Sequence, residues 1–78
     1  MSRWTLCRRA DFVRRLVKLG FDGPYSGARH QFMTTGPHRL TIPSNAEYSV
    51  GQVRLILMIR EVEVVLGRPI SLDDWVKL

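Results

Sequence analysis

The stretch RHQFMTTGPHRLTIP, residues 29–43, decides the fold of this chain. Two short runs of alternating apolar and polar residues flank Gly36 and Pro37, and a glycine-containing pair in this position favours a tight turn between strands. The stretch therefore predicts a β-hairpin with its turn at these two residues.

Side chains of a β-strand point alternately to its two faces, so every second residue shares a face. Leu40 and Ile42 share one face of the second arm, and Phe32 shares a face with His30 in the first. We expect Phe32, Leu40 and Ile42 to face the core, with His30 on the same side but at its rim.

The segment before the hairpin has the spacing of an amphipathic helix. In ADFVRRLVKLGF, residues 10–21, apolar residues recur at helical intervals with arginine and lysine between them. Gly20 is a good stop signal, because it can adopt the left-handed conformation that ends helices and allows Phe21 to pack back onto Leu16. Thr5 is the better of the two candidate N-caps, the other being Cys7.

A third strand is expected around Tyr25 and Ser26. Pro24 cannot donate a backbone hydrogen bond to a sheet, so this strand should be short or lie at an edge.

Residues 53–66 predict a second helix, with Ser49 as a plausible cap, although the alternating EVEVVL at its end is also compatible with an extended segment. Ten of its fourteen side chains are apolar, more than one helix face can bury in so small a domain. The surplus suggests a surface for a partner protein or a second copy of the chain. Ser71, followed by Asp74, predicts a short terminal helix anchored by Trp75.

The expected order is therefore helix, three short strands, helix and short helix. An antiparallel sheet covered by helices on one face buries these patterns economically, so the predicted class is α+β. At 78 residues, with no long linker, the chain is expected to be one domain spanning residues 1–78.

Composition narrows the functional classes. The formal net charge is +5, and a polyanion such as RNA or DNA is the natural partner of a basic surface. Cys7 is the single cysteine, which excludes an internal disulfide and a cysteine-rich zinc site and fits a reducing cytoplasm. There is no secretory leader and no apolar run long enough for a membrane span, so a cytoplasmic location is expected. We expect no large cofactor in so short a chain.

His30 is the candidate for chemistry. Imidazole can accept or donate a proton near neutral pH, which suits RNA cleavage, since RNA supplies its own nucleophile in the 2′-hydroxyl and needs no metal. Arg29 and Arg39 are the nearest groups that could hold the phosphate. The alternative is that His30 is an ordinary histidine at the sheet rim. A zinc site with His38 is disfavoured because a third ligand is lacking nearby.

The first helix carries a basic face that could contact phosphates or simply be solvated. For the basic side chains taken together, RNA binding is the better interpretation, because helical RNA is recognised largely through its phosphates and 2′-hydroxyls. The candidates for RNA contact are Arg14, Arg15 and Lys18, next to Arg8 and Arg9 in the same segment.

Four segments together resemble the HicA toxin family of bacterial type II toxin-antitoxin systems. They are LVKLGFDGPYSGARHQFM (16–33), RLTIP (39–43), SVGQVRLIL (49–57) and ISLDDWVKL (70–78), and they include a Gly-x-x-His motif at Gly27 to His30. The resemblance runs from about residue 8 to the C-terminus. One departure is MIREVEVVLGRPI (58–70), where the family's second helix usually ends sooner.

The resemblance implies a fold similar to the double-stranded RNA-binding domain. It also implies an mRNA-cleaving ribonuclease with His30 as its active residue and a HicB-type antitoxin as its protein partner. Two alternatives remain open, a non-catalytic RNA-binding module of the same fold and a subunit that works only through protein contact.

Overall fold

The predicted hairpin forms the centre of the main sheet. In the computed structural model, which describes residues 4–45, 47–48 and 54–78, β3 (Gln31–Thr35) pairs antiparallel with β4 (His38–Ile42). Gly36 has φ +56°, in the left-handed region that the first turn position of such a two-residue hairpin requires. The turn prediction is confirmed.

The third strand lies at the edge of this sheet. β2 (Asp22–Tyr25) pairs antiparallel with β3, which gives the strand order β2-β3-β4. The edge position expected from Pro24 is confirmed, although the strand ends at Tyr25 and leaves Ser26 in the following loop.

The prediction that Phe32 faces the core is wrong. Met33 is fully buried opposite Leu40, whereas Phe32 is only half-buried and pairs with the exposed Thr41. Leu40 and Ile42 are buried as expected. The alternation was recognised correctly, but the face of β3 that packs on the helices is the one carrying Met33. Phe32 therefore belongs to the outer face of the sheet.

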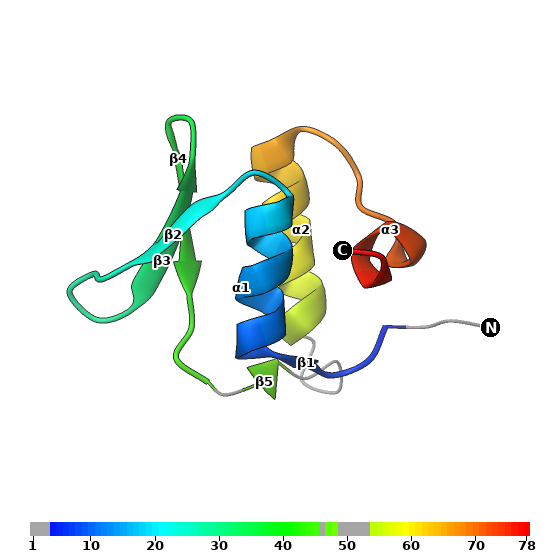
Figure 1. Ribbon diagram of the computed structural model, residues 1–78, viewed down its shortest axis with the longest axis horizontal. Coiled ribbons are helices and arrows are strands. Elements are labelled where there is room, and N and C mark those ends of the chain that lie inside the picture. Colours follow the sequence, from blue (N-terminus) through cyan, green and yellow to red (C-terminus); the bar gives the residue numbers. More distant parts are fainter. Residues whose placement is uncertain (1–3, 46, 49–53) are drawn as a thin grey trace.

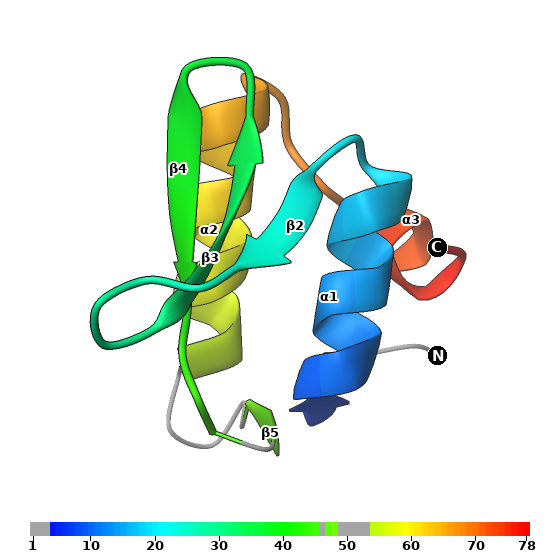
Figure 2. The same cartoon turned by 60° about the vertical axis from the view of Figure 1, so that its left-hand side comes forward.

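Two helices cover one face of the sheet, and a third lies beyond them (Figure 1). α1 (Arg9–Lys18) and α2 (Arg54–Leu66) run in the same direction in both Figure 1 and Figure 2. The short α3 (Leu72–Val76) lies on the side of these helices remote from the sheet. The protein is thus a small α+β domain with a three-stranded antiparallel sheet, as predicted.

The end of α1 follows the expected pattern. The Phe21 N–H donates to the Leu16 carbonyl (3.0 Å) and the Gly20 N–H to the Val17 carbonyl (3.1 Å), with Gly20 at φ +105°. This is the Schellman arrangement, which satisfies carbonyls left free at a helix end. The start differs from expectation, because the N-cap is Arg8, without a side-chain cap bond, and not Thr5.

A second, two-stranded sheet was not predicted. β1 (Cys7–Arg8) pairs antiparallel with β5 (Glu47–Tyr48), so Cys7 lies in a strand and not in the first helix. This pairing joins the chain just before α1 to the segment after β4. Tyr48 is fully buried, and its hydroxyl donates to the Pro43 carbonyl (2.6 Å).

Helical structure is confirmed for residues 54–66, including EVEVVL. The proposed cap Ser49 and the first apolar residue, Val53, lie outside the described residues. Gly67, at φ +73°, follows the last helical residue, and its N–H donates to the Glu63 carbonyl (2.8 Å). At α3, the Ser71 hydroxyl accepts from the Asp74 N–H (3.1 Å), so this cap is also confirmed.

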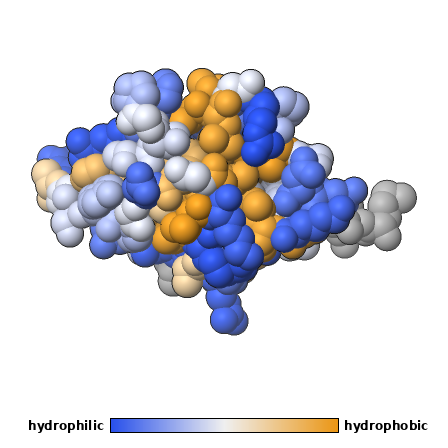
Figure 3. Space-filling view, turned by 45° about the horizontal axis from the view of Figure 1, so that its top comes forward, coloured by the Kyte–Doolittle hydropathy of each residue, from blue (hydrophilic) through white to orange (hydrophobic). Residues whose placement is uncertain are grey.

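The core lies between the sheet and the helices and extends to α3. Its largest fully buried side chains are Trp75, Tyr48, Phe12, Leu16, Met33, Ile42, Leu55 and Val62. Apolar residues also reach the surface, and Figure 3 shows an apolar band across the middle of one face, bordered by hydrophilic side chains. Among the described residues, no helix has the length and apolar character needed to cross a membrane.

Candidate functional site

His30 lies at the end of the tight loop that joins β2 to β3. It is exposed, in a bend immediately before Gln31, the first residue of β3. The expectation that it points to the core side of the sheet is not met. The core-facing side of β3 carries Met33, and His30 is predicted to share the face of Phe32. Its side chain is available to solvent and to a ligand.

The shape of this loop depends on Gly27. A β-carbon at position 27 would overlap the carbonyl oxygen of His30 and would lie 3.4 Å from the Phe32 ring and 3.5 Å from an Arg39 guanidinium nitrogen. A side chain there would force the loop to open. The absent side chain at Gly27 therefore allows the backbone of His30, the ring of Phe32 and the head group of Arg39 to gather around one point.

Arg39 and two aromatic rings form a stack on the outer face of the sheet. The guanidinium carbon of Arg39 lies 3.6 Å from the centroid of the Phe32 ring, close enough for a strong cation–π contact. The Tyr25 and Phe32 ring centroids are 5.6 Å apart with the rings tilted by 39°, and Tyr25 is 48% exposed. Tyr25 is not among the residues that the sequence pattern predicts for the site, and Phe32 is predicted in the core, although both are aromatic.

Arg9 connects the start of α1 to both ends of the hairpin. Its guanidinium donates to the side-chain oxygen of Gln31 and, through Nε, to the Pro43 carbonyl (3.3 Å). Gln31 directly follows His30, so Arg9 helps to fix the position at which β3 begins. From the sequence, Arg9 is predicted only as part of a basic helix face. The residues near Arg9 in the sequence do not indicate a contact with segments as distant as Gln31 and Pro43.

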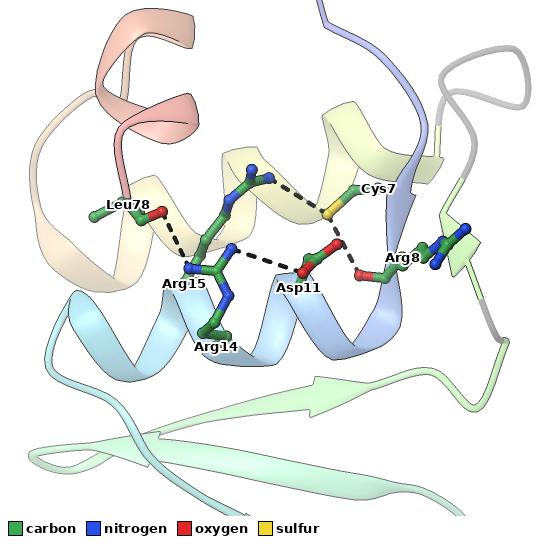
Figure 4. Close-up of polar contacts among 6 residues, drawn as sticks. All are labelled: Cys7, Arg8, Asp11, Arg14, Arg15 and Leu78. Carbon is green, nitrogen blue, oxygen red and sulfur yellow. Dashed lines mark hydrogen bonds and ion pairs between the residues drawn. The ribbon is translucent and has the colours of Figure 1, made fainter.

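The predicted RNA-contacting arginines of α1 are engaged within the protein (Figure 4). Arg14 donates to the Leu78 carbonyl (3.2 Å) and pairs with Asp11 (3.6 Å). Arg15 donates to the Cys7 sulfur (3.7 Å), and its guanidinium carbon lies 5.2 Å from the centroid of the Trp75 ring.

Figure 4 shows Arg15 extending from α1 away from the strands of the hairpin. Its Nε is buried and has no hydrogen-bond partner within the described residues. This is the environment of a side chain that packs α3 against α1.

Lys18 and Arg29 are exposed, Lys18 at the end of α1 and Arg29 next to His30 in the loop. Of the predicted site residues, the fold brings His30, Arg29 and Arg39 to the loop and outer sheet face, while Arg14 and Arg15 face α3. His38 is exposed at the turn end of β4, opposite Thr35. Within the described ranges, histidine, cysteine and acidic residues do not gather into a group of three that could hold a metal ion.

Two buried groups have shifted acidities. Burial raises the pKa of the Cys7 thiol, although the nearby Arg15 charge acts in the opposite direction. Burial also raises the pKa of the Tyr48 hydroxyl, against the opposing charge of Arg9. A buried thiol that keeps its proton is a poor nucleophile, so Cys7 is assigned to the core and not to the candidate site.

The exposed site thus combines an imidazole, guanidinium groups and flat aromatic surface. These groups suit a phosphodiester joined to nucleobases, because guanidinium binds phosphate oxygens and aromatic rings stack on bases. Comparison of the chain with family models, curated proteins and solved structures gave no match.

Proposed function

We propose that this chain is a metal-independent ribonuclease that cleaves mRNA, with His30 as its general acid or base. The observation that carries the proposal is the exposed His30 on a glycine-dependent loop, with the Arg39 guanidinium held on the Phe32 ring at the same loop. This arrangement offers a proton-transfer group and a positioned phosphate-binding group at one loop.

In the proposed reaction the 2′-oxygen of a nucleotide attacks the adjacent phosphorus and the bond to the 5′-oxygen of the next nucleotide breaks. The products are a 2′,3′-cyclic phosphate and a 5′-hydroxyl. His30 takes the proton from the 2′-hydroxyl or supplies the proton to the leaving 5′-oxygen. Arg39 and Arg29 stabilise the negative charge that builds on the phosphate oxygens.

The fold supports an RNA substrate. Apart from the short strands β1 and β5, the order α1, β2, β3, β4, α2, with two helices running in the same direction on one sheet face, is the order expected for a double-stranded RNA-binding domain-like fold. Together with the sequence resemblance, this order supports the proposal of a HicA-like toxin that has a HicB-type antitoxin as its partner and acts in the cytoplasm.

A cleavage assay with one modified substrate tests the proposal. A short labelled RNA should be cut to a product ending in a 2′,3′-cyclic phosphate, and a 2′-deoxy substitution at the cleaved nucleotide should stop the reaction. Toxicity on expression should be relieved by a neighbouring antitoxin gene.

The outer-face stack also favours a second candidate, a non-catalytic RNA-binding module. In that case the RNA would bind, dependent on Phe32 and Arg39, and remain intact, and His30→Ala would alter only affinity. Binding of neither RNA nor its deoxy analogue would instead favour a subunit that acts through protein contacts alone.

A further inference from the structure

A groove runs between the outer edge of β4 and α2. It consists of two adjoining hollows of about 420 and 460 Å³ that share Leu57 and Glu61. One wall is formed by β4 and Pro43, the residue that follows it. The opposite wall is formed by α2. The groove does not include His30 or the loop that carries it.

The wall formed by β4 is a free strand edge. The sheet order is β2-β3-β4, and in the part of the chain that the structure describes no strand pairs with the other side of β4. Figure 2 shows β4 at the border of the sheet with α2 behind it. Since an antiparallel ladder uses the backbone groups of alternate residues on each side, half of the β4 peptide groups point toward the groove side.

The wall formed by α2 is apolar and exposed. Val64 is 81% exposed and Leu57 is 59% exposed, and Val65, Met58 and Leu40 extend the apolar lining. An exposed apolar strip next to a free strand edge is the setting in which an extended peptide adds to a sheet, with alternate side chains entering pockets.

The charges around the groove are mainly positive. Among the described residues, Arg54, Arg60 and Arg39 border it, against the single acidic residue Glu61. A second copy of this chain would bring the same arginines together across a two-fold axis, which is unfavourable. RNA would leave the apolar strip uncovered. The complementary occupant is an acidic polypeptide with apolar residues at alternate positions.

We propose that the β4–α2 groove binds an extended, acidic segment of a partner protein, which adds to β4 as a fourth strand. Apolar side chains on one face of the added strand cover Leu57 and Val64. The side chains at its other positions point to the outer face of the sheet, where acidic residues meet Arg39. The groove excludes His30 but shares Arg39, at its border, with the RNA site proposed above, and the proposal stands whether or not the chain cleaves RNA.

A pair of synthetic peptides tests the proposal on the full chain. The first is a ten-residue peptide in which valine alternates with glutamate, and the second has lysine in place of glutamate. We expect only the acidic peptide to bind in a fluorescence-anisotropy titration, and we expect it to slow amide hydrogen exchange along β4.

Two variants locate the contact. Val64→Ser removes apolar area and Arg60→Glu reverses a charge, and each should weaken binding of the acidic peptide by about tenfold, roughly the loss of one good contact. The matched controls are Val17→Ser, an exposed valine on α1, and Arg68→Glu, an exposed arginine after α2 that does not line the groove. Both controls should bind like the unmodified chain.

Several outcomes overturn the proposal. They are equal binding of the lysine peptide, exchange protection elsewhere than β4, and equal weakening by the control variants. Dimerisation of the chain that Val64→Ser abolishes would assign the groove to a second copy. Competition by an RNA oligonucleotide that Arg60→Glu abolishes would assign it to nucleic acid.

Discussion

The Arg39 guanidinium lies over the Phe32 ring, with 3.6 Å between its central carbon and the ring centroid. The two residues come from adjacent strands, and their contact is on the outer face of the sheet, away from the core. The ring holds the guanidinium in place while its exposed side and its N–H groups remain available. A cation held in this way loses little side-chain freedom when it binds a phosphate.

Phe32→Leu should therefore weaken RNA binding without unfolding the protein. Cation–π contacts are worth about 0.5–2 kcal/mol, which corresponds to a loss of about twofold to thirtyfold in affinity. The melting temperature should change little, because Phe32 is outside the core. Binding titrations and thermal melts check this, with Thr34→Ser on the same outer face as the control. A large drop in melting temperature at unchanged affinity would contradict the prediction.

His30→Ala should abolish RNA cleavage while the chain remains folded. The side chain is exposed, so its loss removes proton transfer and not packing. General acid-base catalysis contributes about 10²-fold to 10⁴-fold, and the cleavage rate should fall by that factor. His38→Ala, at another exposed position of the hairpin, should stay close to the unmodified rate. A stable and fully active His30→Ala protein would exclude this histidine from the mechanism.

Gly27→Ala should reduce activity by displacing His30. The added methyl group meets the His30 carbonyl, and relief of such crowding costs about 1–3 kcal/mol in stability and moves the loop. Gly20→Ala is the matched control, because it meets no neighbouring atom but forces alanine into a left-handed conformation at a cost of about 1–2 kcal/mol.

Both glycine variants should have a lower melting temperature. Only Gly27→Ala should also have an RNA cleavage rate lower than its unfolded fraction explains. Rates measured well below both melting temperatures distinguish the two effects. Equal rates for the two variants would show that the loop geometry does not matter.

Arg15→Ala and Lys18→Ala should have different effects, because Arg15 packs within the protein and Lys18 is a candidate for RNA contact. Arg15 lies over Trp75 and bonds to Cys7, so its loss should lower the free energy of unfolding by about 1–3 kcal/mol. Lys18 is exposed, so its replacement should leave stability nearly unchanged.

If Lys18 contacts a phosphate, its removal should weaken RNA binding and reduce the slope of log affinity against log salt by about 1. Denaturant unfolding and salt titrations on both variants make the comparison. A stable Arg15→Ala protein with a reduced salt slope would return Arg15 to the RNA-binding set.

The stability of the protein should fall as the pH rises above about 8.5, the ordinary pKa of a cysteine thiol. Because burial raises the pKa of Cys7 in the folded state, the unfolded chain loses the thiol proton first. Between the unfolded and folded pKa values the folded state binds more protons, so its stability decreases with pH. Tyr48 adds a similar decrease at higher pH, because burial raises its pKa as well.

Cys7→Ala should flatten the first part of this decrease, and urea unfolding at a series of pH values measures it. The Tyr48 contribution should persist in this variant at higher pH. An unchanged pH profile for Cys7→Ala would mean that another group is responsible.

Local features of the fold were predictable because each depends on residues a few positions apart. The helix stop at Gly20, the turn at Gly36 and the cap at Ser71 are closed by hydrogen bonds or backbone conformations within their own segments. The alternation of apolar and polar residues in the hairpin and the helical spacing before it likewise depend on residues that are close together in the sequence. From these the α+β class and the edge strand could be inferred, but not the exposed loop position of His30, which is predicted at the rim of the core side.

Tertiary structure decided that the helices pack on the hairpin face that carries Leu40 and Ile42. Phe32 and Met33 are both apolar neighbours on β3, but the register set by the turn places Met33 opposite Leu40 and Phe32 opposite Thr41. The helices pack on the side of Met33, which leaves Phe32 to hold Arg39 on the outer face. The pairing of Cys7 with Tyr48 and the bond from Arg9 to Gln31 join segments that are distant in the chain.

The same packing places the partly buried Arg15 over the ring of Trp75. The periodicity of a sequence predicts which residues share one face of a helix or strand. Whether that face is buried depends on the surface of the element that packs against it.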